Sequence, residues 1–270
     1  AQLSTHPDVE MISFTGSTRA GKAISVAAAE TLKRVTLELG GKGANLLFAD
    51  ADDRAVLRSV KRMMENSGQS CNAPSRLLVE RSVYDATVAK AAEIAASIKV
   101  GPASQSGDHI GPVVNKRQWD QIQGYIQKGI SEGARLVAGG PGLPEGFNRG
   151  FYVKPTIFAD VVPGMTIEKV EIFGPVLAMI PFEGEEEAVR IANDTPYGLT
   201  NYVQSQDGAR RNRMALRLKS GMVQMNGKSR AAGSPFGGVK QSGRAREGGI
   251  WGLEEFLEVK AVSAWDPSQG

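Results

Sequence analysis

Strand-length apolar runs alternate with helical segments in the first hundred residues, and this alternation constrains the fold more than any other feature of the chain. Four runs have the length and composition of strands: Val9–Phe14, Val35–Leu39, Asn45–Phe48 and Arg76–Val79. Three segments between and after them carry apolar residues at helical spacing: Ala20–Leu32, Asp50–Ser67 and Val83–Ile98. The pattern predicts an α/β fold with a mostly parallel sheet flanked by helices.

The rest of the chain continues the alternation with longer polar and Gly-rich loops. Helices are predicted over Trp119–Gly133 and Glu185–Asn193. Strands are predicted over Phe151–Phe158, Val176–Pro181 and Tyr202–Gln204. The alternating run Leu257–Trp265 also predicts a strand, and at a chain end it is a candidate for pairing with another subunit.

Charge and composition limit the classes of partner. The 270 residues carry a net charge of +3, which is too small an excess to indicate a polyanionic partner. The basic stretch Arg210–Lys219 has no interleaved aromatic residues, and its Met214, Leu216 and Leu218 predict a surface helix with a core stripe. We therefore expect no nucleic-acid partner. No apolar run approaches the length of a membrane span, so no membrane contact is expected either.

The single cysteine bears on both compartment and metal chemistry. One cysteine excludes an internal disulfide and a multi-cysteine metal site, which favours a reducing, cytoplasmic location. His6 and His109 lie far apart in loop-like surroundings, so we expect no metal. The chain opens AQLSTHPDVE, with neither an initiator Met nor a signal pattern, and we expect it to be a truncated or proteolysed piece of a longer protein.

A glycine turn between a strand and a helix forms a candidate anion site. Residues 16–23 approach the phosphate-binding pattern G-x-x-x-x-G-K-[ST], but Ala23 lacks the hydroxyl that ligates magnesium. Backbone N–H groups at the start of the helix still favour an anion. The residues leave two readings open, a nucleotide phosphate beside this turn or a plain capped turn.

Cys71, in the stretch GQSCNAPSR, is either an inert buried residue or a nucleophile. Gly68 lets the backbone turn, Ser70 and Asn72 make the surroundings polar, and Pro74 prevents a helix just beyond the thiol. These neighbours favour a reactive thiol over a packed one.

Two carboxylates stand in unusual settings. Glu38 lies inside the apolar run VTLEL before Gly40-Gly41, where it either serves as a general base or faces solvent from a half-exposed strand. Glu171 precedes Phe173 in the turn EIFGP and says little by itself.

Six blocks together resemble the NAD(P)-dependent aldehyde dehydrogenase superfamily, in order and spacing. They are FTGS, LELGGK, GQSCNAPSR, EIFGPV, NDTPYGL and SPFGGVKQSG. The resemblance implies the catalytic domain of that family plus the last strands of a Rossmann-like cofactor domain. It also implies that the full-length enzyme oxidises a small-molecule aldehyde to a carboxylic acid, that NAD or NADP is the cofactor, and that the full-length enzyme is a homodimer or homotetramer.

The resemblance also implies a role for each matching residue. Cys71 would attack the aldehyde and form first a thiohemiacetal and then a thioester. Its own N–H and the side chain of an upstream Asn would form the oxyanion hole. Glu38 would activate the hydrolytic water. The cofactor would be bound by Gly16, Ser17, Leu39, Gly40, Glu171 and Phe173, and Phe236 would form a wall of the aldehyde pocket.

The departures from the family set the expected domain boundaries. The chain matches about the C-terminal half of a member and lacks the first cofactor-domain strands, the upstream Asn and a Lys-containing segment that binds the adenosine end. Residue 170 is Val where many members carry a second Glu. We expect residues 1–41 to be a remnant of the dinucleotide-binding domain, 42–245 the catalytic domain, and 246–270 a return segment with an oligomerisation strand.

Two other functions remain open at this stage. The same Cys71 and Glu38 could hydrolyse activated esters without a nicotinamide, as a thiol esterase. Alternatively, the chain could be a catalytically silent fragment that assembles through Leu257–Trp265.

Overall fold

A computed structural model describes residues 2–264 and 266–269. Its strands are β1 (Met11–Thr15), β2 (Arg34–Glu38), β3 (Ala44–Leu47), β4 (Arg76–Glu80), β5 (Lys99–Val100), β6 (His109–Ile110), β7 (Arg135–Ala138), β8 (Thr156–Ala159), β9 (Val176–Phe182), β10 (Thr200–Gln204) and β11 (Met222–Met225). Its α-helices are α1 (Gln2–Thr5), α2 (Thr18–Ala29), α3 (Ala55–Met64), α4 (Tyr84–Ser97), α5 (Lys116–Ser131), α6 (Thr166–Lys169), α7 (Gly184–Asn193), α8 (Gly208–Arg217) and α9 (Gly249–Glu254).

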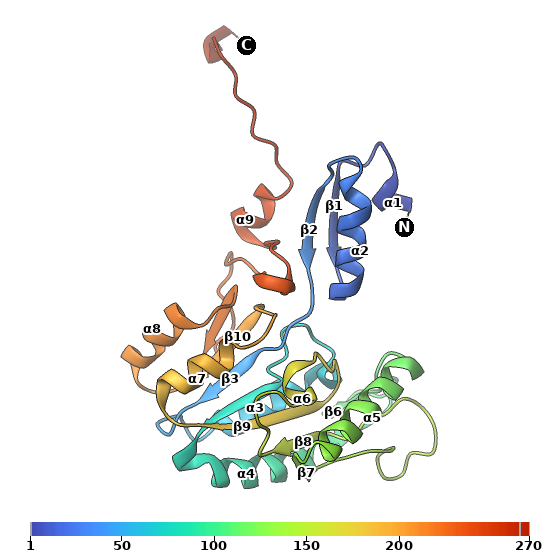
Figure 1. Ribbon diagram of the computed structural model, residues 1–270, viewed down its shortest axis with the longest axis vertical. Coiled ribbons are helices and arrows are strands. Elements are labelled where there is room, and N and C mark those ends of the chain that lie inside the picture. The colour runs from blue at the N-terminus through green and yellow to red at the C-terminus, as the bar shows by residue number, and fades with distance from the viewer. Residues whose placement is uncertain (1, 265, 270) are drawn as a thin grey trace.

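A seven-stranded sheet forms the main body, in the order β11-β10-β3-β4-β9-β8-β7. Every neighbouring pair in it is parallel except β7 with β8. The central strands are buried on both faces, which explains why they read as continuous apolar runs. The predicted α/β fold with a mostly parallel sheet flanked by helices is confirmed (Figure 1).

Successive side chains of β4 supply the two hydrophobic cores. Leu78 packs into a cluster with α5, α6, α7 and α8, whereas Leu77 and Val79 pack into a second cluster with α3 and α4. This alternation is the period of two expected of a strand. The helices therefore cover both faces of the sheet and hold its strand ends in fixed positions.

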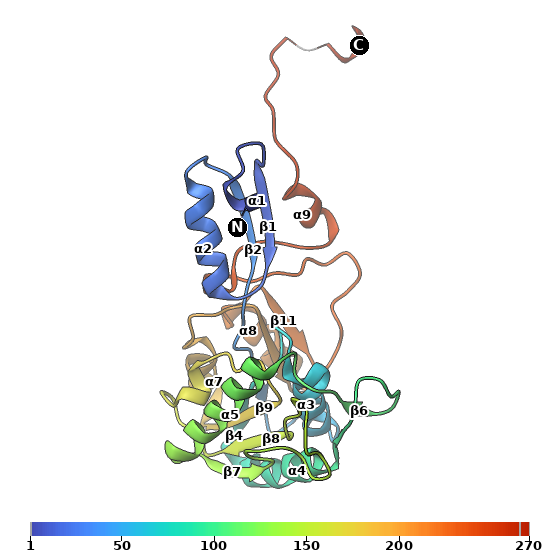
Figure 2. The same cartoon turned by 90° about the vertical axis from the view of Figure 1, so that its right-hand side faces the viewer.

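A separate two-stranded parallel sheet is formed by β1 and β2, which α2 connects. Figures 1 and 2 show this unit standing apart from the main body, to which β2 continues directly through β3. Lys33 ties its far end together, since its Nζ donates to the carbonyls of His6 (2.6 Å) and Val9 (2.5 Å). At the near end, the Leu39 N–H donates to the carbonyl of Ser242, so a late segment of the chain is tied to the end of β2.

Three sequence-based expectations differ from the structure. The strand expected over 151–158 begins only at Thr156, because Pro155 has no N–H to give to a ladder. Leu216 is 89% exposed, whereas Met214 and Leu218 are buried. The expected core stripe was therefore wrong for Leu216, which lies two residues from each and on the opposite side of α8.

No strand is assigned over 257–264, and Trp265 lies outside the described residues. The Leu257–Trp265 strand was therefore wrong for the isolated chain. A strand needs a neighbour for its backbone hydrogen bonds, and this segment leads away from the body after α9 (Figure 2). Its pairing with another subunit stays a prediction.

Candidate active site

The loop that carries Cys71 follows α3 through a left-handed turn. Asn66, Ser67 and Gly68 have φ values of 50°, 55° and 69°. Left-handed backbone at the two non-glycine residues costs about 1–3 kcal/mol each and persists only where the surroundings hold it. Ser67 Oγ donates to the carbonyl of Gly111 (2.7 Å), and Gln69 Oε1 accepts from the N–H of Val114 (2.9 Å). The strained turn therefore directs Cys71 away from the helix in a fixed loop.

Cys71 lines a cleft of ≈ 810 Å³ between the two sheets, which we call the thiol cleft. Eight of the nine residues singled out from the sequence line it: Gly16, Ser17, Glu38, Leu39, Gly40, Cys71, Glu171 and Phe173. The ninth, Phe236, lies in a neighbouring cleft, and Asn72 lines both clefts. The fold thus brings together residues from β2, the Cys71 loop and the turn before β9.

Glu38 is a buried carboxylate at the end of β2. It is 3% exposed, and neither carboxylate oxygen has a hydrogen-bond partner among the described residues. The pKa of Glu38 is raised to about 8, chiefly by burial and then by repulsion from Glu247, while Arg246 acts in the opposite direction. A carboxylate without a partner that faces a cleft indicates a functional group rather than a structural one.

Gly40 and Gly41 allow β2 to approach both Glu171 and the Cys71 loop. The N–H of Gly41 donates to Glu171 Oε1 (2.9 Å). A Cβ atom at Gly40 would lie 2.0 Å from Glu171 Oε2, and one at Gly41 would lie 2.3 Å from the Cys71 carbonyl oxygen. Glycine is therefore required here by close approach.

Gly41→Ala tests this close approach. The contact is with backbone, which cannot rotate away, so we expect the free energy of unfolding to fall by about 1–3 kcal/mol, the usual cost of overpacking. The matched control is Gly124→Ala in α5, where a Cβ meets nothing within 4 Å. That change should raise stability by up to about 1 kcal/mol. Urea unfolding of both variants gives the comparison, and equal values would contradict the packing argument.

The environment of the Cys71 thiol is electrostatically mixed. Burial raises the pKa of Cys71, and the Glu171 and Glu38 carboxylates raise it further. The backbone N–H groups of Asn72 and Cys71 act in the opposite direction. Those N–H groups are the donors that would also stabilise negative charge on an oxygen bound next to the sulfur.

The N-terminus of α2 faces the thiol cleft from the two-stranded sheet. Ser17 is the N-cap, and its Oγ accepts from the N–H of Ala20 (3.3 Å). The N–H of Gly16 donates to the Glu38 carbonyl (3.0 Å), which ties this turn to β2. The first turn of a 12-residue helix favours an anion at this edge.

Several residues of the site were not singled out from the sequence. Gln118, near the start of α5, donates from Nε2 to the carbonyls of Ile172 (3.0 Å) and Phe173 (2.9 Å) and so fixes the turn that carries Glu171. Tyr202 of β10 donates its hydroxyl to the Asn72 carbonyl (2.6 Å) and fixes the loop behind the thiol. No local sequence pattern marks either residue, because both contacts join segments far apart in the chain.

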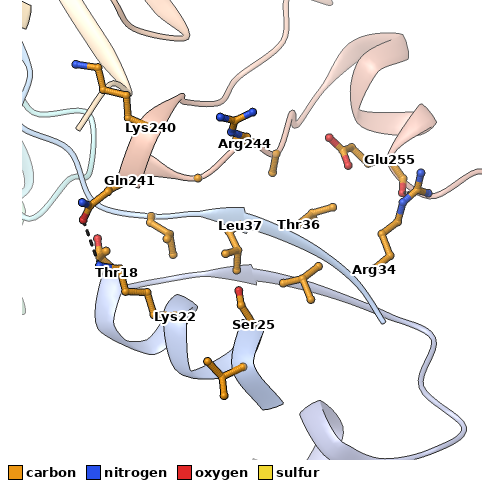
Figure 3. Close-up of a pocket in the computed structure, with 15 residues that line it drawn as sticks. Thr18, Lys22, Ser25, Arg34, Thr36, Leu37, Lys240, Gln241, Arg244 and Glu255 are labelled. Atoms are coloured by element: carbon orange, nitrogen blue, oxygen red, sulfur yellow. Dashed lines mark hydrogen bonds between the residues drawn. The ribbon is translucent and has the colours of Figure 1, made fainter. Parts of the chain in front are cut away.

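A second cavity, also of ≈ 810 Å³, lies on the other side of β2 and contains neither Cys71 nor Glu38. Figure 3 shows it between α2, β2 and the segment around Gln241, where Lys22 Nζ donates to Gln241 Oε1 (3.4 Å). Its wall is mainly apolar, with charged side chains such as Arg34 and Glu255 at the edge. We therefore place the candidate active site in the thiol cleft.

Within 2–264 and 266–269, no three His, Cys, Asp or Glu side chains gather where they could bind a metal ion. The same residues include no helix with the length and hydrophobicity needed to cross a bilayer.

The known proteins that match this sequence belong to one family. The model of the Aldehyde dehydrogenase family matches residues 1–262. The chain is 48% identical over 269 residues to 3-succinoylsemialdehyde-pyridine dehydrogenase from a Pseudomonas species, covering 99% of this chain and 56% of that protein. It spans about half the length of the curated relatives it matches.

Solved structures of aldehyde dehydrogenases are similar to this chain as well. The chain is similar to an aldehyde dehydrogenase from Bartonella henselae, with 62% identity, a TM-score of 0.97, and coverage of 98% of this chain and 56% of that one. It is also similar to aldehyde dehydrogenase C from Pseudomonas syringae, solved with NAD+ and octanal, with 46% identity, a TM-score of 0.95, and coverage of 98% and 55%.

Proposed function

Because the chain belongs to the aldehyde dehydrogenase family, we propose that the protein oxidises an aldehyde to a carboxylic acid with NAD+ or NADP+ and that Cys71 is the nucleophile. The observation that carries this proposal is the meeting of the Cys71 thiol and the unpartnered Glu38 carboxylate in one cleft. A nucleophile and a base with access to one space are what acyl chemistry on a thiol requires.

Cys71 and Glu38 have separate roles in the proposed reaction. The Cys71 thiolate forms a C–S bond to the aldehyde carbon, while the N–H of Cys71 stabilises the resulting oxyanion. Loss of hydride from that carbon leaves a thioester on Cys71. Glu38 then takes a proton from a water molecule while the oxygen of that water attacks the thioester carbon. The C–S bond breaks, the acid leaves, and the thiolate is restored.

The thiol cleft also has groups that fit a dinucleotide. The N-terminus of α2, with Gly16 and Ser17, would hold the pyrophosphate, and the Glu171 carboxylate would accept hydrogen bonds from a ribose. Leu39, Gly40 and Phe173 would flank the nicotinamide, with Gly40 leaving room for it. When bound, the nicotinamide supplies the hydride acceptor.

The pH dependence of hydrolysis tests the role of Glu38. Glu38 accepts a proton from water only when ionised, and its pKa is raised to about 8. We expect thioester hydrolysis to accelerate about tenfold per pH unit below that value and to level off above it. Glu38→Gln should slow hydrolysis by about 10²–10⁴ and abolish the dependence. Rapid-mixing measurement of reduced nicotinamide separates an initial burst from steady turnover.

Glu247→Gln is the matched variant for this pH profile. Glu247 raises the Glu38 pKa by charge repulsion, so its neutralisation should shift the midpoint to lower pH without removing the burst. A flat wild-type profile across neutral pH, or a midpoint that Glu247→Gln leaves in place, would argue against Glu38 as the base.

The esterase alternative is separated by the need for a nicotinamide. We expect absorbance of the reduced nicotinamide to appear when aldehyde is added to protein and NAD+ or NADP+. Hydrolysis of an activated ester at Cys71 with no such absorbance under any aldehyde would favour the thiol esterase. Inertness in both assays, together with slow alkylation of Cys71, would favour the silent assembly fragment.

A further inference from the structure

A cleft of ≈ 880 Å³ adjoins the thiol cleft at Asn72, and we call it the basic cleft. Five cationic side chains line it, against the single carboxylate of Glu65: Arg54, Arg58, Lys61, Arg62 and Arg230. Because Asn72 follows Cys71 directly and lines both clefts, the basic cleft borders the loop that carries the thiol.

Two of the five cations are already neutralised. Arg58 makes paired hydrogen bonds to Asp52 at 2.9 and 2.7 Å, and Arg62 pairs with Glu65 at 2.6 Å. These bonds satisfy the local carboxylates and leave no acidic side chain of the lining unpaired.

The other three cations retain most of their charge. Within residues 2–264 and 266–269, neither Arg54 nor Arg230 has an ion-pair partner, and Lys61 lies 3.8 Å from a fully exposed Asp108. Cations without a close carboxylate produce, in a concave surface, a positive potential that attracts anions. The basic cleft therefore favours a negatively charged ligand.

Arg230 lies beside the residue expected to form the aldehyde pocket. Its guanidinium carbon is 5.7 Å from the centre of the Phe236 ring, and its Nη1 donates to the Ser234 carbonyl. These contacts use part of the guanidinium, and the residue is exposed, so the remaining N–H groups are available to a ligand. A planar guanidinium binds a carboxylate through two parallel hydrogen bonds.

The wall between the two clefts is held rigidly. Tyr202 is 3% exposed, lines the basic cleft, and donates its hydroxyl to the Asn72 carbonyl. A fixed wall keeps the distance from the cations to the Cys71 thiol constant. Such a site discriminates between substrates by the position of their charge.

We propose, building on the proposed function, that the basic cleft selects aldehydes that carry a carboxylate at the end remote from the carbonyl. The carbonyl lies at Cys71, the chain of the substrate passes Asn72 and Phe236, and the carboxylate binds Arg230 with support from Arg54 and Lys61. Specificity is thus set by cations on α3 and on the loop after β11, outside the thiol cleft.

The first test requires only the thiol and is independent of oxidation. Cys71 is alkylated with an iodoacetamide that carries a terminal carboxylate and, separately, with the neutral amide of the same length. We expect the anionic probe to react several-fold faster at low ionic strength and the difference to disappear in about 1 M salt, where the screening length is only about 3 Å. Equal rates at low salt would overturn the proposal.

Arg230→Gln tests whether Arg230 is the source of the preference for the anionic probe. We expect this variant to lose most of the several-fold advantage of the anionic probe, because the charged hydrogen-bonded pair is lost, while its rate with the neutral probe changes far less. Arg149→Gln, an exposed arginine outside both clefts, makes the same charge change and should preserve the preference. A preference reduced equally by both variants would show a general charge effect and contradict the site.

Aldehydes give the second test. The KM for an ω-carboxy aldehyde should rise about tenfold in Arg230→Gln, whereas the KM for the matching n-alkanal should change far less. Turnover of alkanals without a carboxylate preference overturns this inference and leaves the proposed oxidation intact. Selective alkylation without any oxidation overturns the proposed function and leaves the basic cleft intact.

Discussion

Cys71→Ala is expected to lower aldehyde-dependent reduction of the nicotinamide by at least about 10⁴, since loss of a catalytic nucleophile removes the covalent route altogether. The thiol is the only cysteine in the chain and lines the cleft that Glu38 faces. Steady-state absorbance at the reduced-nicotinamide band gives the rate. Intact-mass measurement with an alkylating probe should show one label on the wild type and none on the variant.

The fold should tolerate this change. Cys71 is half-buried in a loop, so Cys71→Ala removes one sulfur atom from the wall of a cleft rather than from a packed core. We expect an unchanged circular dichroism spectrum and nearly unchanged thermal unfolding. A variant that keeps more than about a tenth of wild-type turnover would assign the nucleophile to another group.

Arg76→Met is expected to lower the free energy of unfolding by up to about 3–5 kcal/mol, because the buried Glu168 keeps only its second ion pair, with Lys169 at 3.2 Å, and the other hydrogen bonds of Arg76 are lost. Arg76 and Glu168 are 0% and 1% exposed and lie 3.1 Å apart. The Arg76 guanidinium also donates to the carbonyls of Lys42, Ile191 and Ala192. These bonds join the start of β3 to the end of α7, and Met cannot replace them.

The matched control is Arg190→Met, since Arg190 pairs with Glu187 on the exposed face of α7. Surface pairs of this kind contribute less than about 1 kcal/mol. The double variant Arg76→Met with Glu168→Leu should recover part of the loss, because it leaves no buried carboxylate unpaired. Denaturant titration gives the free energy of unfolding of the wild type and of the three variants. A loss of less than about 1 kcal/mol for Arg76→Met would contradict the assigned role.

The buried ion pair of Arg76 with Glu168 has no mark in the sequence. The sequence alone could not predict the pairing, because its partners lie on different elements far apart in the chain.

Most of the fold could be predicted because its central strands are buried on both faces. β3, β4 and β9 are continuous apolar runs, so their position and parallel arrangement followed from the pattern. The edge strands β7 and β11 were not predicted. Most of their side chains are partly exposed, and runs of four residues such as Met222–Met225 are too short to show a periodic pattern.

The candidate site was predicted from blocks of sequence rather than from the chemistry of single residues. Until the resemblance joined them, Cys71 kept an alternative as an inert residue and Glu38 an alternative as a solvent-facing side chain, and the structure then placed both in one cleft. The basic cleft was not predicted, because Arg54 and Arg230 meet only through tertiary folding. The left-handed Asn66 and Ser67 likewise have no mark in the sequence.

The two-stranded sheet of β1 and β2 has few interior contacts of its own. Among the described residues, neither large hydrophobic cluster includes any residue before Ala44. Glu38 belongs to this lightly packed unit, whereas Cys71 belongs to the seven-stranded body. Local opening of β1 and β2 would therefore separate base from nucleophile at a lower free energy than global unfolding requires. Amide protons should accordingly exchange faster in β2 than in β4, and heat inactivation should precede melting of the main sheet.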